Sequence, residues 1–218
     1  MEHLSFTFGK HKDRPIQDVF MEDPGYITWL VKKSWFKSKF TKEYQMCMCL
    51  STQGKNELPI RETDIVIYTD GACTNNGSIS AKAGIGVHFS KRNKMSFNDI
   101  SAAFPDNQSV TGNKPTNQRA ELQAIIEALR VTKECPHKLI IYTDSKYSID
   151  CVTKWFPNWV KKNKLEGKKN IDLIRPIYQY YLGKDIEFRH INSHTGLQDE
   201  HSLGNEEADR LATQSILS

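Results

Sequence analysis

The chain has 218 residues, of which 38% are hydrophobic and 26% are charged, and its formal net charge is +4. This composition is typical of a globular protein with one domain, or with one domain and a small appendage. The mild positive charge is compatible with a polyanionic partner without requiring one, and no apolar run is long enough to span a membrane.

Three segments follow one another along the chain. Residues 1–50 form a small N-terminal module that is too short to hold a large core by itself. Residues 51–63 are mostly polar and contain a proline, which indicates a linker. Residues 64–218 have the length of an ordinary domain, and we expect the chemistry of the protein there.

The larger segment begins with a predicted antiparallel meander. Strands are expected near residues 65–70, 84–89 and 100–104, and the short connections between them favour antiparallel neighbours. A helix follows Pro115, with Thr116 or Asn117 as its N-cap. Its apolar residues recur at spacings of three and four, which is typical of a stripe buried against a sheet.

Helices and strands then alternate. A strand at residues 139–143 can return through the preceding helix to lie parallel to the first strand. Further helices are predicted near 145–155 and 170–182, a last strand near 186–191 and a final helix near 205–215. The sequence therefore predicts an α/β fold with a mixed five-stranded sheet, three antiparallel strands followed by parallel ones, flanked by helices.

Two strands with nearly the same sequence each end in an aspartate. Ile-Tyr-Thr precedes both Asp70 and Asp144, so adjacent parallel strands would bring two carboxylates to one edge of the sheet. Glu121 and Asp209 are expected on the sheet-facing stripes of two helices. Each helical acid alone is explained as a surface or helix-terminus residue, but four converging acids would repel one another and predict a divalent cation site.

Five cysteines predict free thiols. Their number is odd and their spacing fits neither a disulfide framework nor a zinc site; they are Cys47, Cys49, Cys73, Cys135 and Cys151. For Cys47 and Cys49, which are two residues apart, ordinary packing is favoured over metal binding, because no second pair of ligands lies nearby. With no apolar segment behind a basic N-terminus, we expect an intracellular protein of a reducing compartment, cytoplasm or nucleus, that is not secreted.

Six short motifs resemble those of the type 1 ribonucleases H and stand in the order of that family. The resemblance covers residues 65–213. The motifs are Tyr68-Thr69-Asp70-Gly71 with Asn76-Gly77, Ala83-Gly84-Ile85-Gly86, Thr116-Asn117-Gln118-Arg119-Ala120-Glu121, Tyr142-Thr143-Asp144-Ser145, Ser193-His194-Thr195-Gly196, and Gly204-Asn205-Glu206-Glu207-Ala208-Asp209. The family implies a ribonuclease H-like fold and an endonuclease that cuts the RNA strand of an RNA–DNA hybrid.

The resemblance also implies the chemistry. It assigns the metal ions, two Mg²⁺ that Mn²⁺ can replace, to Asp70, Glu121, Asp144 and Asp209. Two such ions about 4 Å apart activate a water and stabilise the leaving oxygen, and the family's products carry a 5′-phosphate and a 3′-hydroxyl. His194 corresponds to a loop histidine that assists proton transfer or product release. Because the loop at 196–204 is longer than in the family, His201 is an alternative for that role.

Both strands of the hybrid have candidate contacts in the resemblance. Contacts to the RNA strand are assigned to Gly71, Asn76, Asn117 and Gln118, although each is also explained as a turn or cap residue. Contacts to the DNA strand are assigned to Lys114, Thr116, Trp155, Trp159, Lys161, Lys162 and Asn170. Lysine at position 114 replaces the arginine of many members, which keeps the charge and loses the planar fork.

The N-terminal module lacks the hybrid-binding sequence common in eukaryotic members. Its Phe8-Gly9-Lys10, Asp23-Pro24-Gly25-Tyr26 and Trp29-Leu30 resemble a small module of some exonucleases and viral replication proteins. Lysines around Trp35 and Phe36 are compatible with a nucleic-acid partner, a protein partner, or packing on the larger domain. We expect the chain to be monomeric. Two other functions remain alternatives: a catalytically silent hybrid-binding module, and another nuclease of the same superfamily.

Overall fold

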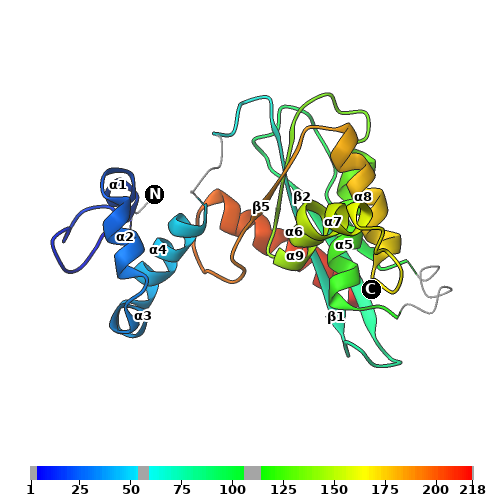
Figure 1. The fold of residues 1–218 in the computed structure, drawn as a ribbon. Coiled ribbons are helices and arrows are strands. Elements are labelled where there is room, and N and C mark those ends of the chain that lie inside the picture. Colours follow the sequence, from blue (N-terminus) through cyan, green and yellow to red (C-terminus); the bar gives the residue numbers. More distant parts are fainter. Residues whose placement is uncertain (1–3, 54–58, 106–113, 218) are drawn as a thin grey trace. The chain divides into compact units, whose positions relative to one another are not determined.

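The structure is a computed structural model that describes residues 4–53, 59–105 and 114–217 (Figure 1). Residues 54–58, which lie within the predicted linker, are outside the described part. The chain divides into two compact units, Met1–Pro59 with Thr195–Leu197, and Ile60–His194 with Gln198–Ser218. No helix in the described part is long and apolar enough to cross a membrane.

The first unit is a cluster of short helices with a core of its own. The helices are α1 (Ile16–Glu22), α2 (Pro24–Leu30), α3 (Ser34–Lys39) and α4 (Thr41–Gln53). Asp23 caps α2 by accepting a hydrogen bond from the Tyr26 amide, and Pro24 at the first helical position has the φ that a helix start needs. The buried side chains are Phe6, Ile16, Val19, Ile27, Leu30, Phe36 and Cys47.

The second unit contains a five-stranded sheet with the order β3-β2-β1-β4-β5. The strands are β1 (Ile65–Thr74), β2 (Lys82–Phe89), β3 (Ile100–Ala103), β4 (Leu139–Thr143) and β5 (Ile186–His190). β1 and β3 pair with β2 in antiparallel fashion, and β4 lies parallel to both β1 and β5. The predicted α/β fold class and the mixed sheet are thereby confirmed.

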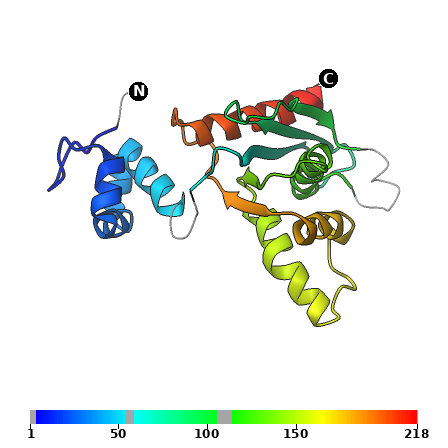
Figure 2. The same cartoon turned by 90° about the horizontal axis from the view of Figure 1, so that it is seen from above.

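Helices cover both faces of this sheet (Figure 2). They are α5 (Asn117–Val131), α6 (Lys146–Asp150), η2 (Cys151–Trp155), α7 (Phe156–Lys161), α8 (Ile171–Gly183) and α9 (Glu200–Leu217). Ile65 and Ile67 of β1 join the core under α5, and the intervening Val66 and Tyr68 pack with Ala208 of α9. This alternation follows from the two-residue period of a strand.

Glycines let two helices approach the sheet at backbone distance. A Cβ on Gly86 of β2 would lie 2.0 Å from the Ala208 carbonyl oxygen of α9, and one on Gly84 would lie 2.3 Å from the Ala212 carbonyl oxygen. A Cβ on Gly71 of β1 would lie 2.2 Å from the Glu121 nitrogen in α5. These close approaches bring the acids of both helices towards Asp70. Asp70 does not end its strand as predicted, because β1 continues through Thr74 in its pairing with β2.

The final helix begins earlier than predicted. α9 starts at Glu200 rather than near residue 205, because the Asp199 carboxylate accepts hydrogen bonds from the His201 and Ser202 amides and from the Ser202 hydroxyl. The predicted loop at 196–204 is therefore wrong in its second half. The predicted helix near 145–155 is interrupted as well, since the π-helical turn η2 follows α6 at Cys151.

One lysine fixes the end of α5. The Lys184 ammonium donates to the carbonyl oxygens of Thr132, Lys133 and Cys135 at distances of 2.6, 2.7 and 2.9 Å. We expect Lys184→Met to lower the free energy of unfolding by roughly 1–3 kcal/mol, because three carbonyls at a helix terminus lose their donor. Thermal denaturation measures this. Lys162→Met, at the C-cap of α7, is the matched control, and equal melting temperatures for the two variants would contradict the expectation.

Candidate metal centre and nucleic-acid interface

Three carboxylates from separate parts of the sequence meet at one end of the sheet. Asp70 lies on β1, Glu121 in α5 and Asp144 directly after β4, and one oxygen from each lies within 4.8 Å of the others. Asp70 and Glu121 are only 6% and 5% exposed. Buried charges of like sign are costly unless something compensates them, so this arrangement requires a proton or a cation.

Burial dominates the electrostatics of the cluster. Burial, followed by the Asp144 charge, raises the pKa of Asp70 to about 8. Burial also raises the pKa of Glu121 well above its ordinary value, with the Asp70 charge as the next cause, and burial raises the pKa of Asp144. The metal-free protein therefore keeps protons on this cluster at pH values where isolated carboxyls are ionised.

Within the described part of the chain, one buried oxygen of Glu121 has only the neighbouring Asp70 carboxyl with which to share a proton, so it lacks a donor once both acids are ionised. Glu121 Oε1 accepts a hydrogen bond of 3.4 Å from the Asn117 amide, whereas Glu121 Oε2 is buried and has no partner among the described residues. A buried acceptor without a donor is rare and calls for a missing ligand. An all-oxygen set of carboxylates fits a hard divalent cation. The observed cluster therefore has the chemistry of a metal centre.

Asp209 and His194 lie close enough to influence the cluster. Asp209 is not one of the three mutually close carboxylates, but its negative charge raises the pKa of Asp70, Glu121 and Asp144. Against the larger effect of burial, a hydrogen bond from Ser193, the charge of His190 and the charge of His194 lower the pKa of Asp144, in that order. His194 is exposed and has a left-handed backbone with φ of 51°, which is costly for a residue with a side chain.

His201 is held away from the loop in which it was expected. It lies in the first turn of α9, with Nδ1 2.9 Å from the Tyr68 hydroxyl and Nε2 3.4 Å from the Tyr142 hydroxyl. Its ring stacks on Tyr142 at a centroid distance of 4.4 Å. These contacts give His201 a packing role in the second unit.

The candidate RNA contacts gather beside the acids. The backbone amide of Asn117 donates to Asn76 Oδ1 at 3.4 Å, which ties the turn after β1 to the start of α5. The side-chain amide of Asn117 donates to Glu121 Oε1. Gln118 is exposed on the same helical turn. Gly71 has a structural task in addition, since its missing side chain makes room for α5.

The candidate DNA contacts form a second group. Trp155 lies at the end of η2 and Trp159 in α7, with ring centroids 6.3 Å apart, and Lys168 Nζ lies 5.3 Å from the Trp159 centroid. Thr116 caps α5 by accepting from the Arg119 amide. Lys114, Lys161 and Lys162 are exposed.

A buried arginine connects these candidates, and the sequence analysis gave it no role. Arg119, 2% exposed, donates to both oxygens of Asp172 and to Asn170 Oδ1. Asn170 Nδ2 in turn donates to the Tyr147 hydroxyl, and the Tyr147 ring packs edge-on against Trp155. Arg119 lies inside a recognised motif, but no local pattern indicates a partner that lies 53 residues away.

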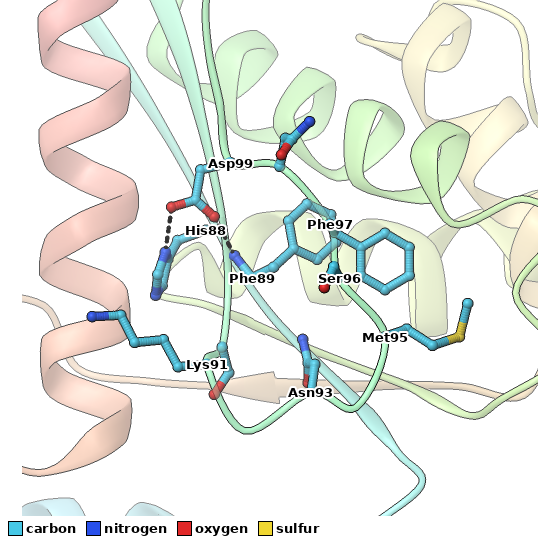
Figure 3. Close-up of a pocket in the computed structure, with 10 residues that line it drawn as sticks. His88, Phe89, Lys91, Asn93, Met95, Ser96, Phe97 and Asp99 are labelled. Atoms are coloured by element: carbon cyan, nitrogen blue, oxygen red, sulfur yellow. Dashed lines mark hydrogen bonds and ion pairs between the residues drawn. The ribbon is translucent and has the colours of Figure 1, made fainter.

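A separate hollow of about 430 Å³ lies along the β2–β3 connection (Figure 3). His88 Nδ1 lies 2.7 Å from Asp99 Oδ2, and the Phe89 amide donates to Asp99 Oδ1 at 2.8 Å. The Asp99 carboxylate is therefore satisfied by His88 and by the Phe89 amide. None of the predicted site residues lines this hollow.

The mixed sheet and the acidic cluster together have the arrangement of the ribonuclease H class. In agreement, residues 62–216 match the family described as RNase H. The chain belongs to the RNase H family. Residues 6–34 match the family described as Exodeoxyribonuclease X-like C-terminal, which corresponds to the resemblance of the N-terminal module.

Individual relatives are similar to the second unit. Rat Ribonuclease H1 is 36% identical over 69% of this chain and 49% of its own length. Ribonuclease H of Rickettsia typhi is 36% identical over 70% of this chain and 91% of its own length. The solved PFV RNase H domain has a TM-score of 0.57 and 27% identity, covering 70% of this chain and 94% of that domain. The chain spans about half the length of the mammalian relatives it matches.

Proposed function

We propose that this protein is an endoribonuclease that hydrolyses the RNA strand of RNA–DNA hybrids and leaves 5′-phosphate and 3′-hydroxyl ends. The observation that carries the proposal is the buried cluster of Asp70, Glu121 and Asp144, with an unpartnered Glu121 oxygen among the described residues. Family membership and the names of the relatives support the same activity.

The residues of the cluster, together with Asp209, would hold two Mg²⁺ ions, or Mn²⁺ in their place. When bound, such a pair supplies an activated water and neutralises charge on the phosphate and on the departing 3′ oxygen. Buried carboxylates suit this task because the low local dielectric strengthens their attraction for the cations. His194, exposed beside Asp144, would exchange a proton with the reacting groups or assist release of the product.

Substrate recognition would use the two groups of candidate contacts. Gly71 on β1, Asn76 in the turn that follows it, and Asn117 and Gln118 in α5 would contact 2′-hydroxyls of the RNA strand. The pair Trp155 and Trp159 would pack against deoxyribose of the DNA strand. Thr116, Asn170 and the exposed lysines Lys114, Lys161 and Lys162 would hold its phosphates.

Cleavage of a labelled hybrid tests the proposal directly. The full chain is incubated with Mg²⁺ or with EDTA, and duplex RNA, duplex DNA and the hybrid are compared in parallel. We expect cleavage of the RNA strand of the hybrid alone, and only with the metal. Binding without cleavage would identify a silent hybrid-binding module, and cleavage of duplex DNA would identify another nuclease of the superfamily.

The acidic cluster also predicts a pH-dependent stability. Because the pKa of folded Asp70 is about 8 and that of the unfolded residue about 3.8, the metal-free protein loses stability as pH rises between these values. We expect Asp70→Asn in EDTA at pH 8 to raise the free energy of unfolding by roughly 1–3 kcal/mol and the melting temperature by about 2–4 °C per kcal/mol.

The gain should shrink as the pH approaches 5, and Mg²⁺ should stabilise the parent protein more than the variant. Asp185→Asn, an exposed aspartate just before β5, serves as the control and should show no such pH dependence. A variant less stable than the parent at pH 8 in EDTA would show that the cluster is not repulsive.

We further propose that the protein acts as a monomer in a reducing intracellular compartment. The cysteines Cys47, Cys73, Cys135 and Cys151 are free thiols, and all except Cys73 are buried. Free, buried thiols of this kind persist where glutathione keeps cysteines reduced.

A further inference from the structure

A run of positive charge occupies one part of the first unit. Between residues 32 and 42 there is no acidic residue, and the basic residues are Lys32, Lys33, Lys37, Lys39 and Lys42. None of these lysines forms an ion pair with an acid among the described residues, whereas Asp23 pairs with Lys10 and Glu22 pairs with Arg14. This concentration of uncompensated charge on and around α3 favours a polyanion.

Two exposed indoles accompany this charge, one just before the lysines in sequence and one among them. Trp29 of α2 is 49% exposed and Trp35 of α3 is 39% exposed. They stand at the two ends of a continuous row of aromatic rings in contact, which runs Trp29, Tyr26, Phe6, Phe8, Trp35. Because Phe6 is fully buried, the row is anchored in the core, and both indoles are held in place at the surface.

Lysines and rings are interleaved on this surface. Lys33 Nζ lies 4.8 Å from the Trp29 centroid, and Lys37 Nζ lies 6.0 Å from the Tyr44 centroid. A ligand that fits must offer both anionic groups for the ammonium ions and flat faces for the indoles. An acidic peptide without aromatic side chains offers the first but not the second, and a paired duplex hides the faces of its bases. An unpaired nucleic-acid strand offers both.

We propose that the first unit binds an unpaired nucleic-acid strand, with Trp29 and Trp35 stacking on bases and the lysines of residues 32–42 contacting phosphates. The proposal does not rest on the hydrolytic activity of the second unit. It gives the N-terminal module a ligand class, an unpaired strand, which the family match at residues 6–34 leaves open.

Binding of a labelled 20-nucleotide deoxythymidine strand tests the proposal. The full chain carrying Asp144→Asn is used in EDTA, and fluorescence anisotropy gives the dissociation constant at several salt concentrations. We expect Trp29→Ala with Trp35→Ala to weaken binding by roughly tenfold or more, because stacking on each indole is lost. Circular dichroism and thermal denaturation check that the variant is folded.

A second variant keeps the test independent of the tryptophan packing. Lys33→Gln with Lys37→Gln should reduce the slope of log affinity against log salt by about 1.4, the value for two single-strand phosphate contacts. Lys91→Gln with Lys133→Gln removes the same charge from the second unit and should leave the slope unchanged.

Three results would overturn the proposal. One is unchanged affinity in both the tryptophan and the Lys33/Lys37 variants. Another is a paired DNA 20-mer that binds as tightly as the strand and loses as much affinity in the tryptophan variant, which would mean that this surface does not require unpaired bases. A third is vesicles of phosphatidylserine binding more tightly than the strand and losing that binding in the same variants, which would indicate a membrane surface instead. The same substitutions are also made in the parent chain, which keeps Asp144. The rate at which those variants cleave the hybrid reports separately on the proposed hydrolysis.

Discussion

Asp144→Asn should abolish cleavage of the hybrid while leaving the protein folded. The side chain directly follows β4 and lies within 4.8 Å of the Asp70 and Glu121 ligand oxygens, so its charge is positioned to hold a cation. Asparagine has nearly the same shape and loses only the charge. We expect the rate to fall roughly 10³-fold or more, which corresponds to about 4 kcal/mol of lost transition-state stabilisation.

The measurement is single-turnover cleavage of a labelled hybrid in Mg²⁺, with hybrid affinity measured in parallel in EDTA. Affinity should change little, because the candidate strand contacts lie on other residues, and the melting temperature should not fall. Asp185→Asn removes an equivalent charge before β5 and should cleave at the parent rate. That side chain is 68% exposed, and its one ion pair within the described part of the chain is a 4.0 Å contact with Arg61. Parental activity in Asp144→Asn would remove the cluster from the reaction.

The sheet and the acid pair were predictable because they depend on short-range patterns. Two apolar, β-branched runs that each end in aspartate require buried strands, and the helix between them allows a parallel return. Thr116 was recognisable as an N-cap because the cap is a local hydrogen bond, here from the Arg119 amide to its hydroxyl. Such features are encoded within a few residues of one another.

The features that sequence analysis missed depend on distant partners. The early start of α9 depends on the Asp199 cap, and His201 then packs between Tyr68 and Tyr142, two residues on neighbouring strands. The Arg119–Asp172 ion pair joins helices 53 residues apart in sequence, which no periodicity can indicate. Burial and pairing of this kind are decided by tertiary packing, so they can be identified only from the three-dimensional structure.

Gly71→Ala should destabilise the protein and disrupt the metal centre together. An added Cβ would lie 2.2 Å from the Glu121 nitrogen and 2.4 Å from the Ala120 carbonyl carbon, and backbone atoms of a packed helix cannot move aside easily. We expect the free energy of unfolding to fall by roughly 3 kcal/mol or more. Any folded fraction should cleave about 10²-fold more slowly, because a shift of about 1 Å in α5 displaces Glu121.

Gly183→Ala is the matched control, since it ends α8 and a Cβ there meets nothing within 4 Å. That variant should be as stable as the parent or slightly more stable, because alanine restricts the unfolded chain.

The comparison also separates two explanations of Gly71. A residue that serves only as an RNA contact would raise the KM for the hybrid without changing the melting temperature. A residue that makes room for α5 must lower the melting temperature even when no substrate is present, and a Gly71→Ala protein with parental melting would contradict the packing argument.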